Sequence, residues 1–250
     1  MTKLDRTTLE RHNRAQLEYF ERAGRHAMRP SDSSYVQRQV DRLVAFAGLG
    51  AGERVLDVGC GMGRYTLALA DRGLAVEGLD LSEALLERLR EFDGGRYRIP
   101  LHCADVLDPP DELHGRFDAV VGFFTLHHLH DLTGCLRAMR SLVRSEGRVV
   151  FLEPNPLNPL YYIQMLVVPG MSWSGDRGIL SMREPNVFHA LEAAGLANPA
   201  VERFGFFPPF VVNRRFGPRL EDVLERVRLW RRLLPFQLFR ADAPATGEDS

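Results

Sequence analysis

Hydrophobic and polar positions along residues 53–153 follow two alternating periods. Short apolar runs rich in β-branched residues alternate with longer stretches in which apolar residues recur every three or four positions. The short runs predict strands at 54–58, 74–80, 99–105, 117–124 and 147–153. Strict alternation of strand and helix predicts right-handed crossovers and a parallel sheet covered on both faces. We therefore expect a doubly wound α/β domain.

Two of the intervening segments have the spacing of an amphipathic helix. Residues 82–92 place apolar side chains three or four positions apart, and Ser82 is suited to cap the first turn. Residues 131–144 repeat that spacing. The apolar positions of the two segments are Leu85, Leu86, Leu89 and Phe92, and Leu132, Cys135, Leu136, Met139, Leu142 and Val143.

The sequence on either side extends this domain. Helices are expected at 5–27 and 32–47, near 184–195 and from about 219, with strands near 199–206 and 208–213. Residues 154–183 lose the alternation and are rich in proline and aromatic residues, which is typical of an active-site lid. The predicted division is a helical cap at 1–47, an α/β core at 48–155, a lid insertion at 156–183, the C-terminal part of the core sheet with an amphipathic helix at 184–240, and a disordered tail at 241–250.

Composition and charge narrow the expected function. The formal net charge of −1 gives no overall attraction for nucleic acid, so DNA is not an expected partner. Cys60, Cys103 and Cys135 have no CxxC spacing, which argues against a zinc site and a disulfide framework and favours a reducing compartment. The first thirty residues do not resemble a signal peptide, and no apolar run has the length of a membrane span. A cytoplasmic location is expected.

The stretch 55–66, VLDVGCGMGRYT, joins an apolar run, an acid and a glycine loop. Asp57 is followed by Gly59, Gly61 and Gly63, which let the backbone approach a ligand closely and turn into a helix. A dinucleotide fingerprint needs a glycine where Arg64 stands, and no Gly-Lys-Ser/Thr follows for a Walker loop. The remaining interpretations are a seat for another nucleotide-like ligand or a tight turn without a ligand.

Two further acids end the next two predicted strands. Asp80 lies 21 residues beyond Gly59, where such α/β units carry a carboxylate that accepts hydrogen bonds from both ribose hydroxyls. Asp105 ends the third strand, where a side chain can bind an adenine amino group. Because the carboxyl ends of parallel strands share one edge of the sheet, these acids and Asp57 line that edge. The joint pattern predicts an adenosine-like ligand.

Five segments carry a family resemblance, and they occur in family order and at family spacing. They are VLDVGCGMGRYT, GLDLSEALLERLR, HCADVLD, FDAVVGFFTLHHLHDL and LRAMRSLVRSEGRVVFLEPNP. Over roughly residues 40–155 the chain resembles the class I methyltransferases that use S-adenosylmethionine. The resemblance implies a Rossmann-like methyltransferase fold with a mostly parallel seven-stranded sheet, N-terminal helices and a lid after strand 5. One departure is Ser145-Glu146-Gly147, where the family commonly has Pro-Gly-Gly.

The resemblance also implies S-adenosyl-L-methionine as the cofactor, with S-adenosyl-L-homocysteine as its product, and it implies how the cofactor binds. The backbone of the glycine loop faces the methionine part, and Asp57 orients that loop. Asp80 holds the ribose, Leu81 packs on the adenine, Asp105 and Val106 bind the adenine edge, and Phe123 lies beneath the cofactor. The implied cofactor-binding set is Asp57, Gly59, Cys60, Gly61, Gly63, Asp80, Leu81, Asp105, Val106 and Phe123.

The segment TLHHLHD after the fourth predicted strand offers candidates for a general base. A histidine with an ordinary pKa can remove a proton from an acceptor near neutral pH. His128 is the first candidate and His127 the second, the alternative being histidines that bond to backbone or to Asp131 at a helix start. No metal site is expected, because adjacent histidines would diverge and no acidic cluster completes a ligand set. Glu153 and Asn155 are expected to point toward the pocket or to cap the lid.

The expected acceptor is a small, apolar or aromatic molecule. The Asn/Asp-Pro-Pro-Tyr segment usual in enzymes that methylate the amino groups of nucleic-acid bases is absent after the fourth strand. Apolar and aromatic residues in the lid and later segments suit a hydrophobic ligand, although they can equally fill a core. They are Tyr161, Tyr162, Met165, Met171, Trp173, Phe204, Phe206, Phe207 and Phe210, with Tyr19, Phe20 and Tyr35 from the N-terminal helices.

The final predicted helix is amphipathic and basic. An apolar stripe from Leu220 to Leu234 is surrounded by arginines, so the helix can lie on a membrane surface, pack on its own domain or form a homodimer contact.

A methyltransferase is the favoured function. The alternatives are a non-catalytic S-adenosylmethionine-binding sensor or partner subunit, a tRNA-modifying methyltransferase and an NAD-dependent oxidoreductase.

Overall fold

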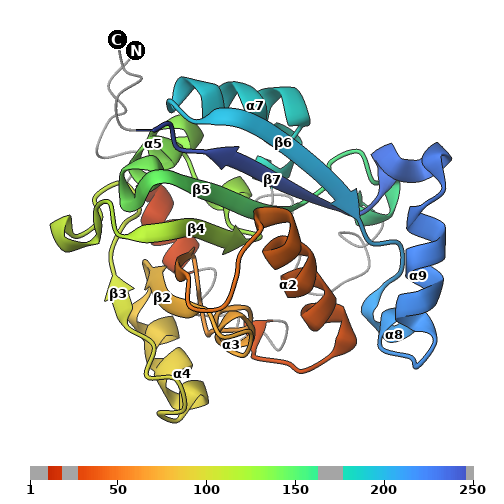
Figure 1. The fold of residues 1–250 in the computed structure, drawn as a ribbon, viewed down its shortest axis with the longest axis horizontal. Helices are drawn as coiled ribbons and strands as arrows, with labels where there is room; N and C mark the ends of the chain where they lie inside the picture. The colour runs from red at the N-terminus through yellow and green to blue at the C-terminus, as the bar shows by residue number, and fades with distance from the viewer. Residues whose placement is uncertain (1–10, 19–27, 163–176, 246–250) are drawn as a thin grey trace.

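A seven-stranded sheet forms the centre of the protein, with strand order β3-β2-β1-β4-β5-β7-β6 (Figure 1). The computed structural model describes residues 11–18, 28–162 and 177–245. The strands are β1 (Arg54–Val58), β2 (Ala75–Asp80), β3 (Leu101–Cys103), β4 (Phe117–Phe123), β5 (Val143–Pro154), β6 (Ala197–Phe204) and β7 (Phe236–Asp242). β7 runs antiparallel to β5 and β6, and the other pairs are parallel. The predicted mostly parallel, doubly wound sheet is confirmed.

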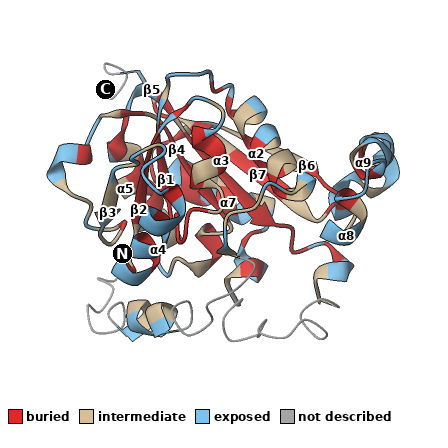
Figure 2. Ribbon diagram, turned by 90° about the horizontal axis from the view of Figure 1, so that it is seen from below, coloured by how far each residue is buried: buried red, intermediate tan, exposed pale blue. Residues whose placement is uncertain are grey.

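Helices cover both faces of this sheet. The described helices are α2 (Ser34–Ala47), α3 (Thr66–Ala70), α4 (Glu83–Asp93), α5 (Leu132–Leu142), α7 (Glu184–Ala193), α8 (Pro209–Val212) and α9 (Gly217–Glu225), with short 3-10 helices η2 (Asp111–Leu113), η3 (Leu126–His128), η4 (Arg177–Ser181) and η5 (Arg228–Leu233), and of these α8 and α9 lie at the margin of the molecule (Figure 2). One core cluster joins α2 and α3 to the sheet, and another joins α5 and α7 to it. Figure 2 shows the buried positions gathered along the sheet and the helix faces turned toward it.

The two helices predicted most clearly form where the spacing placed them. The Ser82 hydroxyl accepts a hydrogen bond from the Leu85 N–H at 3.3 Å, and the Asp131 carboxylate accepts one from the Gly134 N–H at 2.8 Å, so both N-termini are capped by side chains. Phe92 differs from the expected stripe and is 43% exposed. It lies in the last turn of α4, just before Gly94 ends the helix in a left-handed conformation.

The C-terminal part of the chain departs from the prediction in two places. The strand expected at 208–213 is wrong, because α8 forms there. Pro208 and Pro209 lack the N–H that a strand needs, and proline is favoured in the first turn of a helix. The last strand is instead β7, which covers positions expected to belong to the final helix and to the start of the tail. The predicted helix from about 219 shortens to α9, and residues 246–250 lie outside the described residues.

The strand order creates a switch point beside β1. From β1 the chain continues outward to β2 and β3, and then returns to β4 on the other side of β1. Loops leaving neighbouring strands therefore diverge above the carboxyl ends of β1 and β4, which is where α/β sheets bind ligands.

Candidate active site

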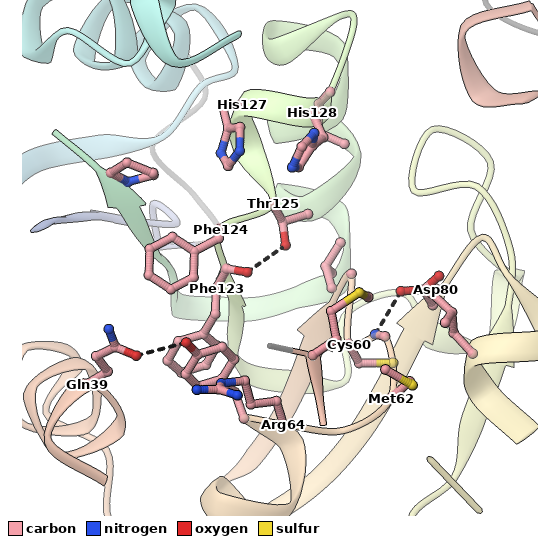
Figure 3. Close-up of a pocket in the computed structure, with 18 of the residues that line it drawn as sticks. Gln39, Cys60, Met62, Arg64, Asp80, Phe123, Phe124, Thr125, His127 and His128 are labelled. Carbon is pink, nitrogen blue, oxygen red and sulfur yellow. Dashed lines mark hydrogen bonds between the residues drawn. The ribbon is translucent and has the colours of Figure 1, made fainter. Parts of the chain in front are cut away.

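A cavity of about 840 Å³ lies at the carboxyl ends of these strands. Its size is in the range of small-molecule sites. The glycine loop after β1, the end of β2 and the segment after β4 contribute to its wall (Figure 3). The loops after β2 and β3 add Leu81 and residues 104–106. Of the predicted cofactor-binding set, Gly59, Cys60, Gly61, Asp80, Leu81, Asp105, Val106 and Phe123 line the cavity, whereas Asp57 and Gly63 do not.

The glycine loop is held by hydrogen bonds to the end of β2. The Gly59 N–H donates to the Leu79 carbonyl at 2.7 Å, and the Gly61 N–H donates to the Asp80 carboxylate at 2.8 Å. Gly59 has a φ of +73°, and a Cβ there would lie 2.6 Å from the Thr125 side chain. A side chain at Gly63 would instead meet Leu89 of α4. The first glycines shape the cavity, whereas Gly63 allows close packing behind it.

Asp57 faces the interior below the loop. It is buried, and its carboxylate accepts a hydrogen bond from the Thr66 hydroxyl at 2.7 Å. Burial raises the pKa of Asp57 to about 7. The contact with Thr66 ties the end of β1 to the first residue of α3, so Asp57 acts on the loop from beneath it.

Asp80 and Asp105 both line the cavity, and each is held by N–H donors. The Asp80 carboxylate accepts from the Gly61 and Ser82 N–H groups at 2.8 and 2.9 Å. The Asp105 carboxylate accepts from the Leu107 N–H at 2.9 Å and from the Asn13 amide at 2.6 Å. Burial raises the pKa of Asp80, and the backbone donors oppose that effect. A carboxylate has about four lone-pair positions, so each acid keeps capacity for a ligand donor.

An aromatic wall of the cavity includes Phe123, which the resemblance placed beneath the cofactor, and Tyr65, which was not anticipated. The ring of Tyr65 stacks on Phe123 with centroids 4.1 Å apart, and its hydroxyl donates to the Gln39 side chain at 2.8 Å. Burial raises the pKa of Tyr65 to about 12, so its hydroxyl keeps its proton at neutral pH. Gln39 is a buried polar residue on the apolar face of α2. That polar position inside an apolar stripe was the available sequence signal.

Phe124 turns the chain away from β4 in a left-handed backbone conformation. Its φ is +58°, which is rare for a bulky side chain, and its N–H donates to the Leu152 carbonyl at 2.7 Å. Such conformations concentrate at functional sites. The turn places Phe124, Thr125 and the η3 histidines in succession along the cavity wall.

His127 is held by a buried carboxylate. Its Nδ1 lies 2.6 Å from Glu153 Oε2, and the other oxygen of Glu153 accepts from the N–H groups of Thr125 and Leu126 at 2.8 and 2.7 Å. Gly178 of η4 packs so closely on the His127 carbonyl that a Cβ there would overlap it. The His127 ring is thereby fixed in position while the residue lines the cavity (Figure 3).

Two expectations about polar residues near η3 are corrected, and Asn155 follows the capping alternative. His127 and His128 do not diverge, since their rings lie 4.0 Å apart and both residues line the cavity. Glu153 does not line the cavity, because the backbone after β4 covers it. The Asn155 amide donates to the carbonyls of Arg232 and Leu234, so it fastens the loop after β5. Within the described ranges, no group of three or more His, Cys, Asp or Glu residues is placed to hold a metal ion.

Residues 11–18 are helical and lie against the cavity. Asn13 reaches Asp105, and the ring of His12 stacks on His130 with centroids 5.0 Å apart. His12 Nε2 also lies 2.8 Å from the His128 carbonyl oxygen. The N-terminal segment therefore contacts both the loop after β3 and the segment after η3.

The residues expected to face the acceptor separate into three groups. Tyr35, Tyr161, Phe206, Phe207 and Phe210 line the cavity. Phe204 belongs to the core, and the Tyr162 hydroxyl donates to the Pro156 carbonyl at 2.7 Å. Tyr19, Phe20, Met165, Met171 and Trp173 lie outside the described residues, as does the middle of the predicted lid.

None of the described helices is long and apolar enough to cross a membrane.

Comparisons with known proteins place this site in a family context. Residues 33–201 match the model of a family described as a methyltransferase domain. A ubiquinone biosynthesis O-methyltransferase of Pseudomonas aeruginosa is 37% identical over 119 residues, which are 47% of this chain and 50% of that protein. The chain thus spans about half the length of the curated relatives that it matches.

Solved structures agree at the level of the fold. A phosphoethanolamine N-methyltransferase 2 from Haemonchus contortus, in complex with S-adenosyl-L-methionine, matches with a TM-score of 0.59 and 19% identity over 83% of this chain and 52% of that one. A possible histamine N-methyltransferase from Thermotoga maritima matches with a TM-score of 0.61 and 14% identity over 91% and 99% of the chains. Because the family model covers more than half of the sequence, the chain belongs to the methyltransferase domain family.

Proposed function

We propose that the protein transfers the methyl group of S-adenosyl-L-methionine to a small apolar acceptor. The observation that carries this proposal is the presence of the glycine loop, Asp80 and Asp105 around one cavity. Membership of the methyltransferase domain family supports it, as do the names of the relatives. The cofactor would supply a methyl group already activated by its sulfonium, so the chain has to bind, align and exclude water.

The residues around the cavity fit this cofactor chemically. Asp80 would accept hydrogen bonds from the ribose hydroxyls, and Asp105 would accept from the adenine amino group. Leu81 and Val106 offer apolar contacts for the adenine, and both line the cavity beside those acids. The backbone at Gly59 and Gly61 leaves room for the methionine part, because side chains there would project toward Thr125 and Met28.

The aromatic wall supports an apolar acceptor. Besides Tyr65 and Phe123, the cavity is lined by the rings of Tyr35, Phe124 and Phe236, which contact one another, and by Phe206 and Phe207. The relatives named as O-methyltransferases favour a hydroxyl as the reacting group. An apolar body carrying one hydroxyl suits this lining.

His127 is the best-placed general base for such an acceptor. With Nδ1 directed at Glu153, its Nε2 is left to accept a proton from the acceptor hydroxyl. Glu153 is a positioning residue, because it fixes the imidazole tautomer without lining the cavity. The same contact favours His127 over His128, which the sequence placed first.

The free cysteines keep the cytoplasm as the proposed location.

Calorimetry and isotope transfer test the function. The protein should bind S-adenosyl-L-homocysteine, and methyl-labelled cofactor should label one component of a metabolite extract. Asp80→Asn should weaken cofactor binding by about 1–3 kcal/mol through lost charged hydrogen bonds. Asp118→Asn is the matched control, because Asp118 lies at the opposite end of β4 and bonds to the Arg54 N–H and to Arg144.

Two outcomes would contradict the proposal in different ways. Binding of NADH without binding of S-adenosyl-L-homocysteine would exclude the cofactor assignment. Tight cofactor binding with no labelled product in any extract would favour a sensor or partner subunit.

A further inference from the structure

Helix α9 turns its polar side toward the protein and its apolar side outward. Glu221 and Glu225 are buried, whereas Leu220 is 40% and Val223 is 59% exposed. An amphipathic helix on the surface of a globular protein usually packs its apolar side against the core and turns its polar side to solvent. Figure 2 shows α8 and α9 at the margin of the molecule with much of their surface exposed.

Two arginines of α2 explain this orientation. Arg38 Nε lies 3.0 Å from Glu221, and Arg38 Nη2 lies 2.9 Å from Glu225. Arg42 Nη2 lies 2.6 Å from the other oxygen of Glu225. The same glutamates accept the N–H groups of Gly205, Phe206 and Phe207. These contacts hold Glu221 and Glu225 on the inner side of α9. The apolar side of the helix therefore faces outward.

The apolar face continues beyond α9 into η5. Six exposed apolar side chains form what we term the α9 patch: Phe216, Leu220, Val223, Val227, Leu229 and Leu233. Leu229 is 79% exposed. A row of large apolar side chains in solvent marks a contact surface.

The exposed charge around the α9 patch is mainly positive. Seven exposed arginines lie between residues 214 and 232. Within the part of the chain that the structure describes, none of the seven forms a salt bridge, because the three acids of this segment pair with Arg38 and Arg42. The patch thus combines apolar contacts with uncompensated positive charge.

We propose that the α9 patch binds the surface of an anionic lipid bilayer. Apolar side chains surrounded by arginine suit insertion at the boundary between headgroups and acyl chains. A symmetric dimer through this patch would bring the exposed arginines of the two copies together, and the half-exposed Asp222 of each copy is already paired with Arg38. The charge therefore favours a lipid surface over a second copy of the chain.

The position of the patch connects it to the cavity. Phe206, Phe207 and Phe210 line the cavity, and Phe210 of α8 is also 73% exposed. The apolar lining thus continues onto the surface beside the α9 patch. If the proposed reaction holds, an apolar acceptor dissolved in the bilayer would reach the cavity without crossing water.

Vesicle flotation of the full chain tests the surface. Wild-type protein should float with vesicles of phosphatidylcholine and phosphatidylglycerol in equal parts and remain unbound with phosphatidylcholine alone. The triple variant Arg226→Glu, Arg228→Glu, Arg231→Glu should lower the partition coefficient on the order of a hundredfold. Val223→Ser with Leu229→Ser should lower it about tenfold.

The controls use the far side of the molecule. Arg88→Glu with Arg90→Glu on α4 should bind vesicles as the wild type does, and circular dichroism should show that all variants are folded. Equal flotation of the wild type and the α9 variants would overturn the proposal. So would a wild-type dimer that ignores vesicles and dissociates on Leu229→Ser, or binding to an acidic protein alone. Failure of flotation would leave methyl transfer untouched.

Discussion

At the residue scale, the two acids Asp57 and Asp80 differ in their hydrogen-bond partners, which oppose the rise that burial causes in the pKa of each. Asp57 and Asp80 end neighbouring strands, yet Asp57 lies in the interior with one hydroxyl partner, whereas Asp80 receives several backbone N–H donors. Burial favours the neutral form of Asp57, so its folded-state pKa is about 7 against an ordinary value of 3.8. Its charge state is therefore linked to stability.

The stability of the ligand-free protein should carry the signature of Asp57. Because the folded state holds this proton more tightly, the contribution of Asp57 is fully present below pH 4 and is lost as pH rises to about 7. Asp57→Asn removes that dependence and keeps an oxygen for Thr66. Urea unfolding should show the variant gaining on the wild type between pH 4 and 7, by about 4 kcal/mol at most. A difference that stays constant across this interval would contradict the assignment.

His127 and His128 offer a matched pair for the base. His127→Ala should lower kcat about a hundredfold or more without changing cofactor affinity. His128→Ala, one residue away on the same cavity wall, should change kcat much less. Glu153→Gln should lower kcat and leave KM for the acceptor nearly unchanged, which separates positioning from binding. A larger loss in His128→Ala would return the role to that residue.

The cavity residues that stand at the ends of strands could be predicted from the sequence. Asp80, Leu81, Asp105 and Val106 line the cavity because parallel strands bring their carboxyl ends to one edge. The burial of Asp57 below the loop could not be predicted, because strand alternation does not reveal what covers a side chain. The stacking of Tyr65 on Phe123 depends on where α3 begins relative to β4, which is a tertiary fact.

At the scale of elements, long-range ion pairs overrode the hydrophobic pattern. The stripe from Leu220 to Leu234 predicts a continuous amphipathic helix that can lie on a membrane, pack on its own domain or form a dimer contact. The ion pairs with Arg38 and Arg42, which lie far away in sequence, turn the acids of α9 inward and its apolar side outward. β7 was missed for a related reason. Gln237 interrupts its apolar run, although its amide is satisfied by the carbonyls of Pro154 and Met182.

Breaking this ion-pair cluster should destabilise the protein measurably. Arg38→Met leaves Glu221 and Glu225 buried with fewer partners, so urea unfolding should show a loss of about 3 kcal/mol. Arg88→Met on α4 is the control, because its pair with Glu91 is largely exposed and should contribute no more than about 0.5 kcal/mol. An equal effect of the two substitutions would show that the cluster is not a structural anchor.

At the scale of the whole molecule, the cavity joins parts of the chain that lie far apart in sequence. Asn13, the glycine loop, Phe206 and Phe236 all contribute to its wall. A ligand in the cavity therefore contacts segments that must all be in place for the native state. The geometry of the sheet alone does not bring them together.

Ligand binding should accordingly stabilise the entire fold. S-adenosyl-L-homocysteine at a hundred times its dissociation constant should raise the free energy of unfolding by about 2.7 kcal/mol. Thermal unfolding followed by circular dichroism measures this, and NADH at the same concentration serves as the comparison. A rise with NADH alone, or with neither compound, would contradict the cofactor assignment.

The place of β7 has a consequence for how the protein is made. β6 pairs in the sheet with β7, which also pairs with β5, so during synthesis β6 has no position in the sheet until residues 236–242 exist. Until then, the outer edge of β5 and both edges of β6 present unpaired backbone groups. A chain halted or cleaved before Phe236 would therefore be a species prone to aggregation, even though every residue that lines the cavity at the ends of β1 to β4 had already been synthesised.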